Sequence, residues 1–165
     1  MKTITLAATA GFCLTATPAS AQDALTAEAF VEKAALSNSF EIATSDLAVD
    51  EADDDAVEDF ARQMLADHAR AGEELAAVLE AEGMEMPPTA LPPEKAQRLA
   101  ELEEADDEAF DRLYVTIQLQ AHEEAVALFS GYAQDGENAA LKDFATRTLP
   151  VLEQHLQHVQ QLAAR

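Results

Sequence analysis

Apolar side chains recur every three or four residues along most of this chain, which is the spacing of one face of an α-helix. Glycine and proline, which interrupt helices, number only five and six, and no alternating β-branched run reaches the length of a strand. We therefore predict an all-α protein with four helical segments. They cover about 26–49, 54–82, 93–134 and 139–163, and the third has one candidate break at Ala105-Asp106-Asp107.

The connection between the second and third segments is longer than the other two. Two proline pairs, Pro87-Pro88 and Pro92-Pro93, exclude regular helix between residues 84 and 93. A connection of this length can cross the end of a helical bundle. Long helices with two short turns and one longer connection are typical of a four-helix bundle with one crossover, of which the ferritin-like topology is the obvious member.

The first 21 residues have the features of a secretory signal peptide. Lys2 precedes an apolar run, and an Ala-x-Ala pattern at 19–21 offers a cleavage site. The run is too short for a transmembrane helix, which needs about 20 apolar residues. We therefore predict a signal peptide at 1–21 and a single domain at 22–165. The mature protein is expected to be exported, soluble and periplasmic, without a transmembrane segment.

Composition limits the partners of the mature chain. Cleavage would remove Cys13, the only cysteine, so a metal site must use nitrogen, oxygen or thioether ligands. The net charge is −22, from 10 Lys and Arg against 32 Asp and Glu. Such a surface repels nucleic acid and anionic lipid, which excludes both as partners. It attracts cations loosely, but adaptation to a salty exterior explains it equally well. Protein partners are not indicated.

Three histidines and one glutamate stand on the apolar stripes, where leucine would be expected. Glu41 lies in the first segment, His68 in the second, His122 in the third and His155 in the fourth. In a bundle these side chains can meet at one level, and a polar layer of this kind is how helical bundles bind metals. Glu41, His68, His122 and His155 are therefore candidate ligands for zinc, copper or iron.

Other interpretations of this cluster remain open. The layer could be a hydrogen-bonded network without a ligand, with Ser37, Thr44 and Gln118 as partners, or one of its members could face solvent. A di-iron oxidase is disfavoured, because leucine stands three residues before each histidine in place of the Glu-x-x-His motif. No catalytic residue is predicted. Asp67 and His158 are expected to be surface residues.

Several short motifs follow one another in a characteristic order. They are Phe60-Ala61-Arg62-Gln63-Met64 with Asp67-His68, then Ala121-His122-Glu123-Glu124-Ala125-Val126, then Thr148-Leu149-Pro150-Val151-Leu152 with His155-Leu156. From about residue 28 to 162 the chain resembles the bacterial family catalogued as domain of unknown function 4142. The resemblance implies an exported, ferritin-like helical bundle, and it implies no activity, because none is assigned to that family.

The sequence thus predicts an acidic helical protein of the bacterial envelope that binds a transition metal through its His/Glu cluster. The alternative is a non-catalytic structural or interaction module in which the same cluster is only a buried polar network. An enzyme using the cluster would need an open coordination position and a cleft that reaches it. A non-enzymatic role is favoured.

Overall fold

The structure, a computed structural model, describes residues 25–165, and this part of the chain is all-α. Its helices are α1 (Ala27–Glu51), α2 (Asp55–Glu82), α3 (Pro93–Glu103), α4 (Asp107–Asp135) and α5 (Ala139–Ala163). Within 25–165 no helix combines the length and the hydropathy needed to cross a membrane. The expected signal peptide lies outside the described residues.

The prediction of four helices was wrong in one respect: the expected third helix is two helices. α3 ends at Glu103 and α4 begins at Asp107, so the chain breaks at the acidic stretch that the sequence indicated. The break has a local cause. The carboxylate of Asp106 accepts a hydrogen bond from the Ala109 N–H at 2.9 Å, which caps the first turn of a new helix.

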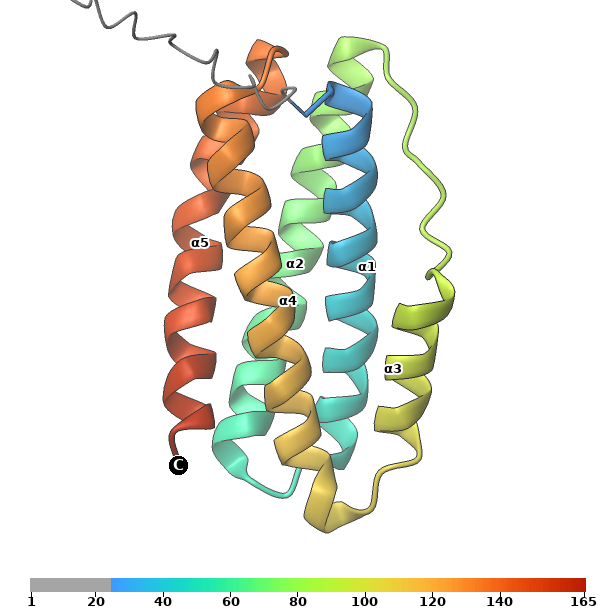
Figure 1. The fold of residues 1–165 in the computed structure, drawn as a ribbon, viewed down its shortest axis with the longest axis vertical. Coiled ribbons are helices and arrows are strands. Elements are labelled where there is room, and N and C mark those ends of the chain that lie inside the picture. Colours follow the sequence, from blue (N-terminus) through green and yellow to red (C-terminus); the bar gives the residue numbers. More distant parts are fainter. Residues whose placement is uncertain (1–24) are drawn as a thin grey trace, which may run out of the picture.

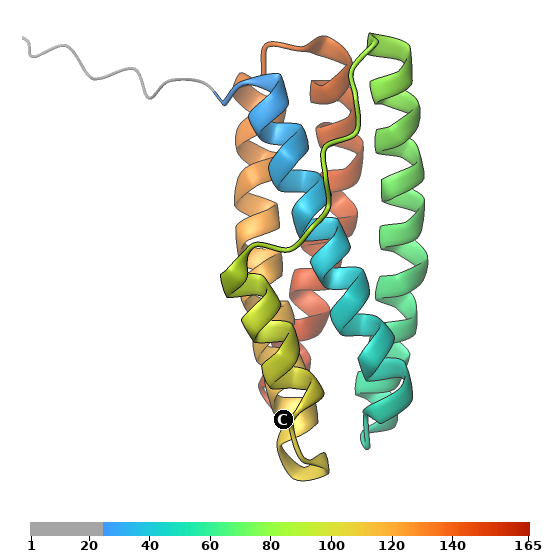
Figure 2. The ribbon, with the colours of Figure 1, turned by 90° about the vertical axis from the view of Figure 1, so that its right-hand side faces the viewer.

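The four long helices lie side by side, and the short helix lies outside them (Figure 1). α1 packs against α2 and α4, and α5 packs against the same two helices from the other side. The connection from α2 to α3 runs down the outside of α1 (Figure 2). It delivers α3 to a position against α1 and α4, which agrees with the expected long connection after the second helix.

Capping residues set the ends of the long helices. Thr26, Asp54, Asp106 and Asn138 precede α1, α2, α4 and α5, and the side chain of each accepts a hydrogen bond from a backbone N–H in the first turn. Gly83 ends α2 with φ of 67°, a left-handed conformation that glycine adopts without steric cost. These local signals explain why the helix bounds follow the sequence pattern so closely.

The interior consists of two apolar clusters with a polar layer between them. The first includes Phe30, Leu75, Phe129, Phe144 and Leu152. The second includes Phe40, Phe60, Phe110, Tyr114 and Val159. Along α2, α4 and α5, the buried histidine of each helix falls between residues of the two clusters. Apolar packing therefore encloses the layer on both sides, where electrostatic interactions are stronger than in water.

Candidate metal centre

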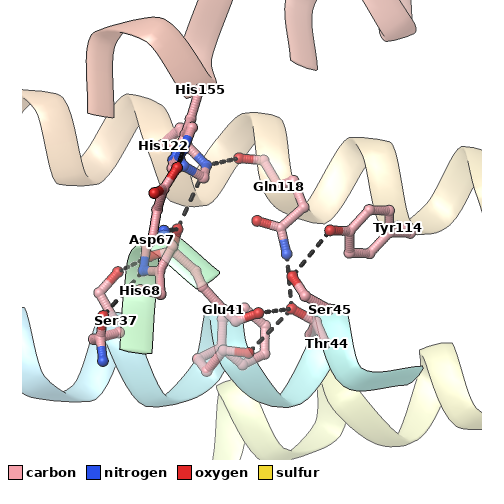
Figure 3. A network of polar contacts seen from close by, with 12 residues as sticks. Ser37, Glu41, Thr44, Ser45, Asp67, His68, Tyr114, Gln118, His122 and His155 are labelled. Atoms are coloured by element: carbon pink, nitrogen blue, oxygen red, sulfur yellow. Dashed lines mark hydrogen bonds and ion pairs between the residues drawn. The ribbon is translucent and has the colours of Figure 1, made fainter. Parts of the chain in front are cut away.

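The structure brings the four candidate residues together, one from each long helix (Figure 3). Their exposed fractions are 1% for Glu41, 4% for His68, 0% for His122 and 1% for His155. The three histidines each offer a ring nitrogen, and these nitrogens lie within 4.8 Å of one another. Glu41 Oε2 lies 3.5 Å from His68 Nε2 and 3.4 Å from His122 Nδ1. The three imidazoles therefore meet inside the bundle, and the Glu41 carboxylate lies against two of them.

Each imidazole is held by a hydrogen bond at one ring nitrogen. The three pairs are His68 Nδ1 with Asn38 Oδ1 at 3.0 Å, His122 Nδ1 with the Gln118 carbonyl at 2.9 Å, and His155 Nε2 with Asp67 Oδ2 at 3.0 Å. Every acceptor is an oxygen without a hydrogen, so the proton of each neutral ring must sit on the bonded nitrogen. The lone pair is then on the opposite nitrogen, as in metal-binding histidines that are oriented by a second hydrogen bond.

The opposite nitrogens have no partner in the described part of the chain. They are His68 Nε2, His122 Nε2 and His155 Nδ1, and the buried Glu41 Oε2 is equally without a hydrogen bond. A buried polar atom without a partner costs about 1–3 kcal/mol. Three of these acceptors are histidine nitrogens, and the fourth, Glu41 Oε2, lies 3.5 Å from His68 Nε2. A cation is the kind of species that such a set of acceptors would stabilise.

Burial keeps at least two of the rings neutral. It lowers the pKa of His68 below the ordinary value of 6.5, against the opposing effect of the Glu41 carboxylate. Burial also lowers the pKa of His155 to about 4, although the hydrogen bond to Asp67 acts in the other direction. Neutral imidazole is the form that binds a metal, so at neutral pH both side chains are ready to act as ligands without losing a proton.

The other oxygen of Glu41 fixes its orientation. Glu41 Oε1 accepts a hydrogen bond from the Ser37 hydroxyl at 2.7 Å, which leaves Oε2 directed toward His68 and His122. A carboxylate in the protein interior is costly unless positive charge or several hydrogen bonds compensate it. One hydroxyl donor gives little compensation, so this carboxylate also favours a cation in the cluster.

Comparison of the chain with known proteins shows its family and its fold. The family model described as "Domain of unknown function (DUF4142)" matches residues 14–162. The chain belongs to the DUF4142 family. The resemblance seen in the sequence motifs is thereby confirmed, and no curated protein matches this DUF4142 chain significantly.

A solved structure shares the fold of this DUF4142 chain. It is the crystal structure of a DUF305 fragment from Deinococcus radiodurans, with a TM-score of 0.72 over 82% of this chain and 93% of that one. The sequences are 14% identical, so the likeness concerns the helical fold alone.

The residues that orient the DUF4142 cluster were only partly predicted. Ser37 contacts it as expected, whereas Gln118 contributes its backbone carbonyl to His122, and its side-chain amide donates to Thr44 at 2.7 Å instead. Asn38 was missed. Little in the sequence indicated Asn38 as a partner, because this residue lies beside the apolar stripe of α1 and not on it.

The expectation that Asp67 is solvated was wrong, whereas His158 lies off the cluster as expected and is partly exposed. The Asp67 side chain is 20% exposed and bridges α2 to His155 on α5. Adjacent residues of a helix point in different directions, and α2 has helices on two sides, so Asp67 and His68 each meet a different neighbour. His158 lies outside the cluster and is half-buried, with its ring packed edge-on against Phe60 at 5.0 Å between centroids.

One pair of atoms in the DUF4142 cluster has nearly the spacing of ligands in a tetrahedral metal site, whereas the histidine nitrogens lie farther apart. Nitrogen and oxygen ligands lie about 2.0–2.1 Å from zinc, which separates tetrahedral ligand atoms by roughly 3.3 Å. The distance of 3.5 Å between Glu41 Oε2 and His68 Nε2 is near that value. Ring nitrogens up to 4.8 Å apart must approach one another by about 1 Å or more when an ion binds.

Proposed function

We propose that this DUF4142 protein binds one transition-metal ion, zinc, copper or iron, in the layer between its two apolar clusters. The ligands would be His68 Nε2, His122 Nε2, His155 Nδ1 and Glu41 Oε2. One observation carries the proposal: three buried histidines from three helices place ring nitrogens within 4.8 Å of one another, with the buried carboxylate of Glu41 beside them. A hydrogen-bonded network without a ligand would give each buried acceptor a donor, whereas these four atoms accept no hydrogen bond within the described residues.

Binding without catalysis is the role that the ligand set supports. Three histidines and a carboxylate supply four ligands, which completes the tetrahedral coordination of zinc and leaves no position for a substrate or a reactive water. The burial of all four side chains agrees with a closed site. We therefore propose storage, sequestration or structural use of the metal as the function, in an otherwise non-enzymatic protein.

Metal retention by the purified protein tests this proposal directly. Residues 22–165 would be stripped with a chelator, incubated separately with zinc, copper and ferrous iron, desalted and assayed by elemental mass spectrometry. We expect about one ion per chain for at least one metal, as a single four-ligand site predicts. His122→Ala should lose the ion because it removes one of the ligands.

The matched control is His158→Ala, which removes a histidine of α5 that lies outside the cluster. It should retain metal like the wild type. Retention of no metal by the wild type, or equal retention by His122→Ala, would contradict the proposal and leave the layer as a structural network.

We also propose that the protein is exported to the periplasm after cleavage between Ala21 and Gln22. The positive charge, the apolar run and the small residues at 19–21 support this. Mass spectrometry of protein recovered from a bacterial periplasmic fraction should show Gln22 as the first residue. Ala21→Trp should block cleavage, because the peptidase needs a small residue there. Uncleaved wild-type protein in the cytoplasmic fraction would contradict export.

We further infer that the long helices follow the ferritin-like order. The short turns within the pairs α1–α2 and α4–α5, with a long connection between the pairs, support this inference. A crystal structure of the mature protein, superposed on ferritin-like bundles, tests it. A different helix order in that superposition would refute the assignment.

A further inference from the structure

A pocket between α1 and α2 has both exposed and buried residues in its wall, and His68 is one of the buried ones. Its volume is about 90 Å³, and all four long helices contribute to its wall. The exposed Thr89, in the connection that runs over α1, lies at its outer end. Phe129 and Phe144 form part of the inner wall. A cavity needs only about 10–15 Å³ to hold a water molecule, so this pocket has room for several.

The pocket reaches the cluster through the residues that orient it. Ser37, which holds Glu41, and Asn38, which holds His68, both line the pocket. Among the four candidate ligands, His68 alone lines it, and it has the largest exposed fraction of the four. The pocket therefore adjoins the cluster, and His68 is the candidate ligand that lies next to it.

We propose that this pocket is the route by which the metal ion enters and leaves the site, and that His68 is the ligand that opens to let it pass. This inference rests on the proposed metal-binding function. A partly hydrated ion would travel past the hydroxyl and amide groups of Ser37 and Asn38. Once it reaches Glu41, the histidines replace its remaining water.

His68 has the hydrogen bond that is easiest to break. His155 is held by a carboxylate, and hydrogen bonds to charged groups are roughly twice as strong as those between neutral groups. His122 is held by a carbonyl of its own helix, which cannot move independently. His68 is held by the neutral amide of Asn38. Gly72 faces this amide: a Cβ on Gly72 would lie 3.2 Å from Asn38 Nδ2, so glycine leaves the amide room to turn.

Rates of cobalt binding and release test the route. Cobalt(II) in a tetrahedral site absorbs visible light, so stopped-flow absorbance follows its association, and an excess of chelator follows its dissociation. Ala71→Leu puts a larger side chain into the pocket wall. We expect the rates of cobalt association and dissociation to fall at least tenfold. The dissociation constant should stay within about threefold, because obstructing an entry route slows both directions equally and leaves the equilibrium unchanged. The control is Ala76→Leu, at an exposed position of α2 outside the pocket.

A second pair of variants covers the case in which the Ala71→Leu substitution disturbs His68 itself. Thr89→Trp narrows the outer end of the pocket. Ala90→Trp is its control, because it introduces the same large side chain at a neighbouring residue that does not line the pocket. Thr89→Trp should slow both rates and Ala90→Trp should not. Wild-type rates in both Ala71→Leu and Thr89→Trp would overturn the route, even with normal binding at equilibrium. Retention of none of zinc, copper, iron or cobalt by the wild-type protein would instead overturn the proposed function, and the route with it.

The opening of His68 has its own test. Asn38→Ala removes the hydrogen bond of His68, and Asp67→Ala removes that of His155. If His68 opens first, Asn38→Ala should speed cobalt release about tenfold, within the range known for the partners of metal ligands. Asp67→Ala should speed it less. A larger acceleration in Asp67→Ala would show that His155 is the ligand that opens.

Discussion

Zinc is expected to raise the midpoint of thermal unfolding of the metal-free protein by roughly 10 °C, and His122→Leu should abolish this increase. An ion at a thousand times its dissociation constant stabilises the folded state by about 4 kcal/mol. For a domain of this size, each kcal/mol shifts the midpoint by about 2–4 °C. Circular dichroism at a helix band, recorded during heating with and without zinc, measures the effect.

The same variant separates the two interpretations of the polar layer. Without metal, His122→Leu should be as stable as the wild type or more stable, because leucine replaces a buried ring whose Nε2 has no partner among the described residues. The structural interpretation also expects this change to be tolerated, so the response to zinc is the measurement that separates the two. His158→Leu is the control and should keep the full response to zinc. An equal response in His122→Leu would show that zinc acts at some other place.

Acid is expected to destabilise the metal-free protein strongly. As the pH falls below 6.5, a histidine in the unfolded chain takes up a proton, whereas folded His155 stays neutral until the pH nears its pKa of about 4. The unfolded state therefore binds more protons, and the free energy of unfolding falls as the pH falls through this interval. His155 alone should contribute a loss of about 2 kcal/mol by pH 5 and about 3 kcal/mol by pH 4. The lowered pKa of His68 acts in the same direction.

Urea unfolding at pH 7, 6, 5 and 4 measures this loss. Between pH 6.5 and 5, histidines are the groups with ordinary pKa values that titrate, so this part of the curve reports on them. In His155→Leu the free energy of unfolding should change less between pH 6.5 and 5, because the histidine with the lowered pKa is gone. Stability that stays constant or rises from pH 6.5 to 5 in the metal-free wild type would refute the explanation.

The sequence was sufficient to predict the long helices and the four cluster residues. Helix bounds depend on local signals such as the Asp54 cap and Gly83, which are visible without a structure. Glu41, His68, His122 and His155 stand on inward stripes, and inward stripes of packed helices must meet. The signal peptide, the domain division and the binding of metal stay predictions.

Other features depended on how the helices are placed against each other. Asp67 contacts His155 because of how α2 and α5 are rotated relative to each other. The spacing of residues within α2 cannot predict that rotation. Asn38 reaches His68 for a similar reason, across the contact of α1 with α2. The position of α3 and the pocket at His68 arise from segments far apart in the chain, so the sequence pattern of any single helix could not reveal them.

The distribution of the ligands over four helices affects how the bundle would come apart. Of the four proposed ligands, Glu41 and His68 lie on the pair α1–α2, and His122 and His155 lie on the pair α4–α5. Neither hairpin alone could hold the ion with full coordination. A bound metal would therefore act as a cross-link between the two hairpins, and it would add cooperativity, since partial separation releases the ion. Unfolding would become slower, while folding, which must assemble both hairpins before the ion can bind, would keep its rate.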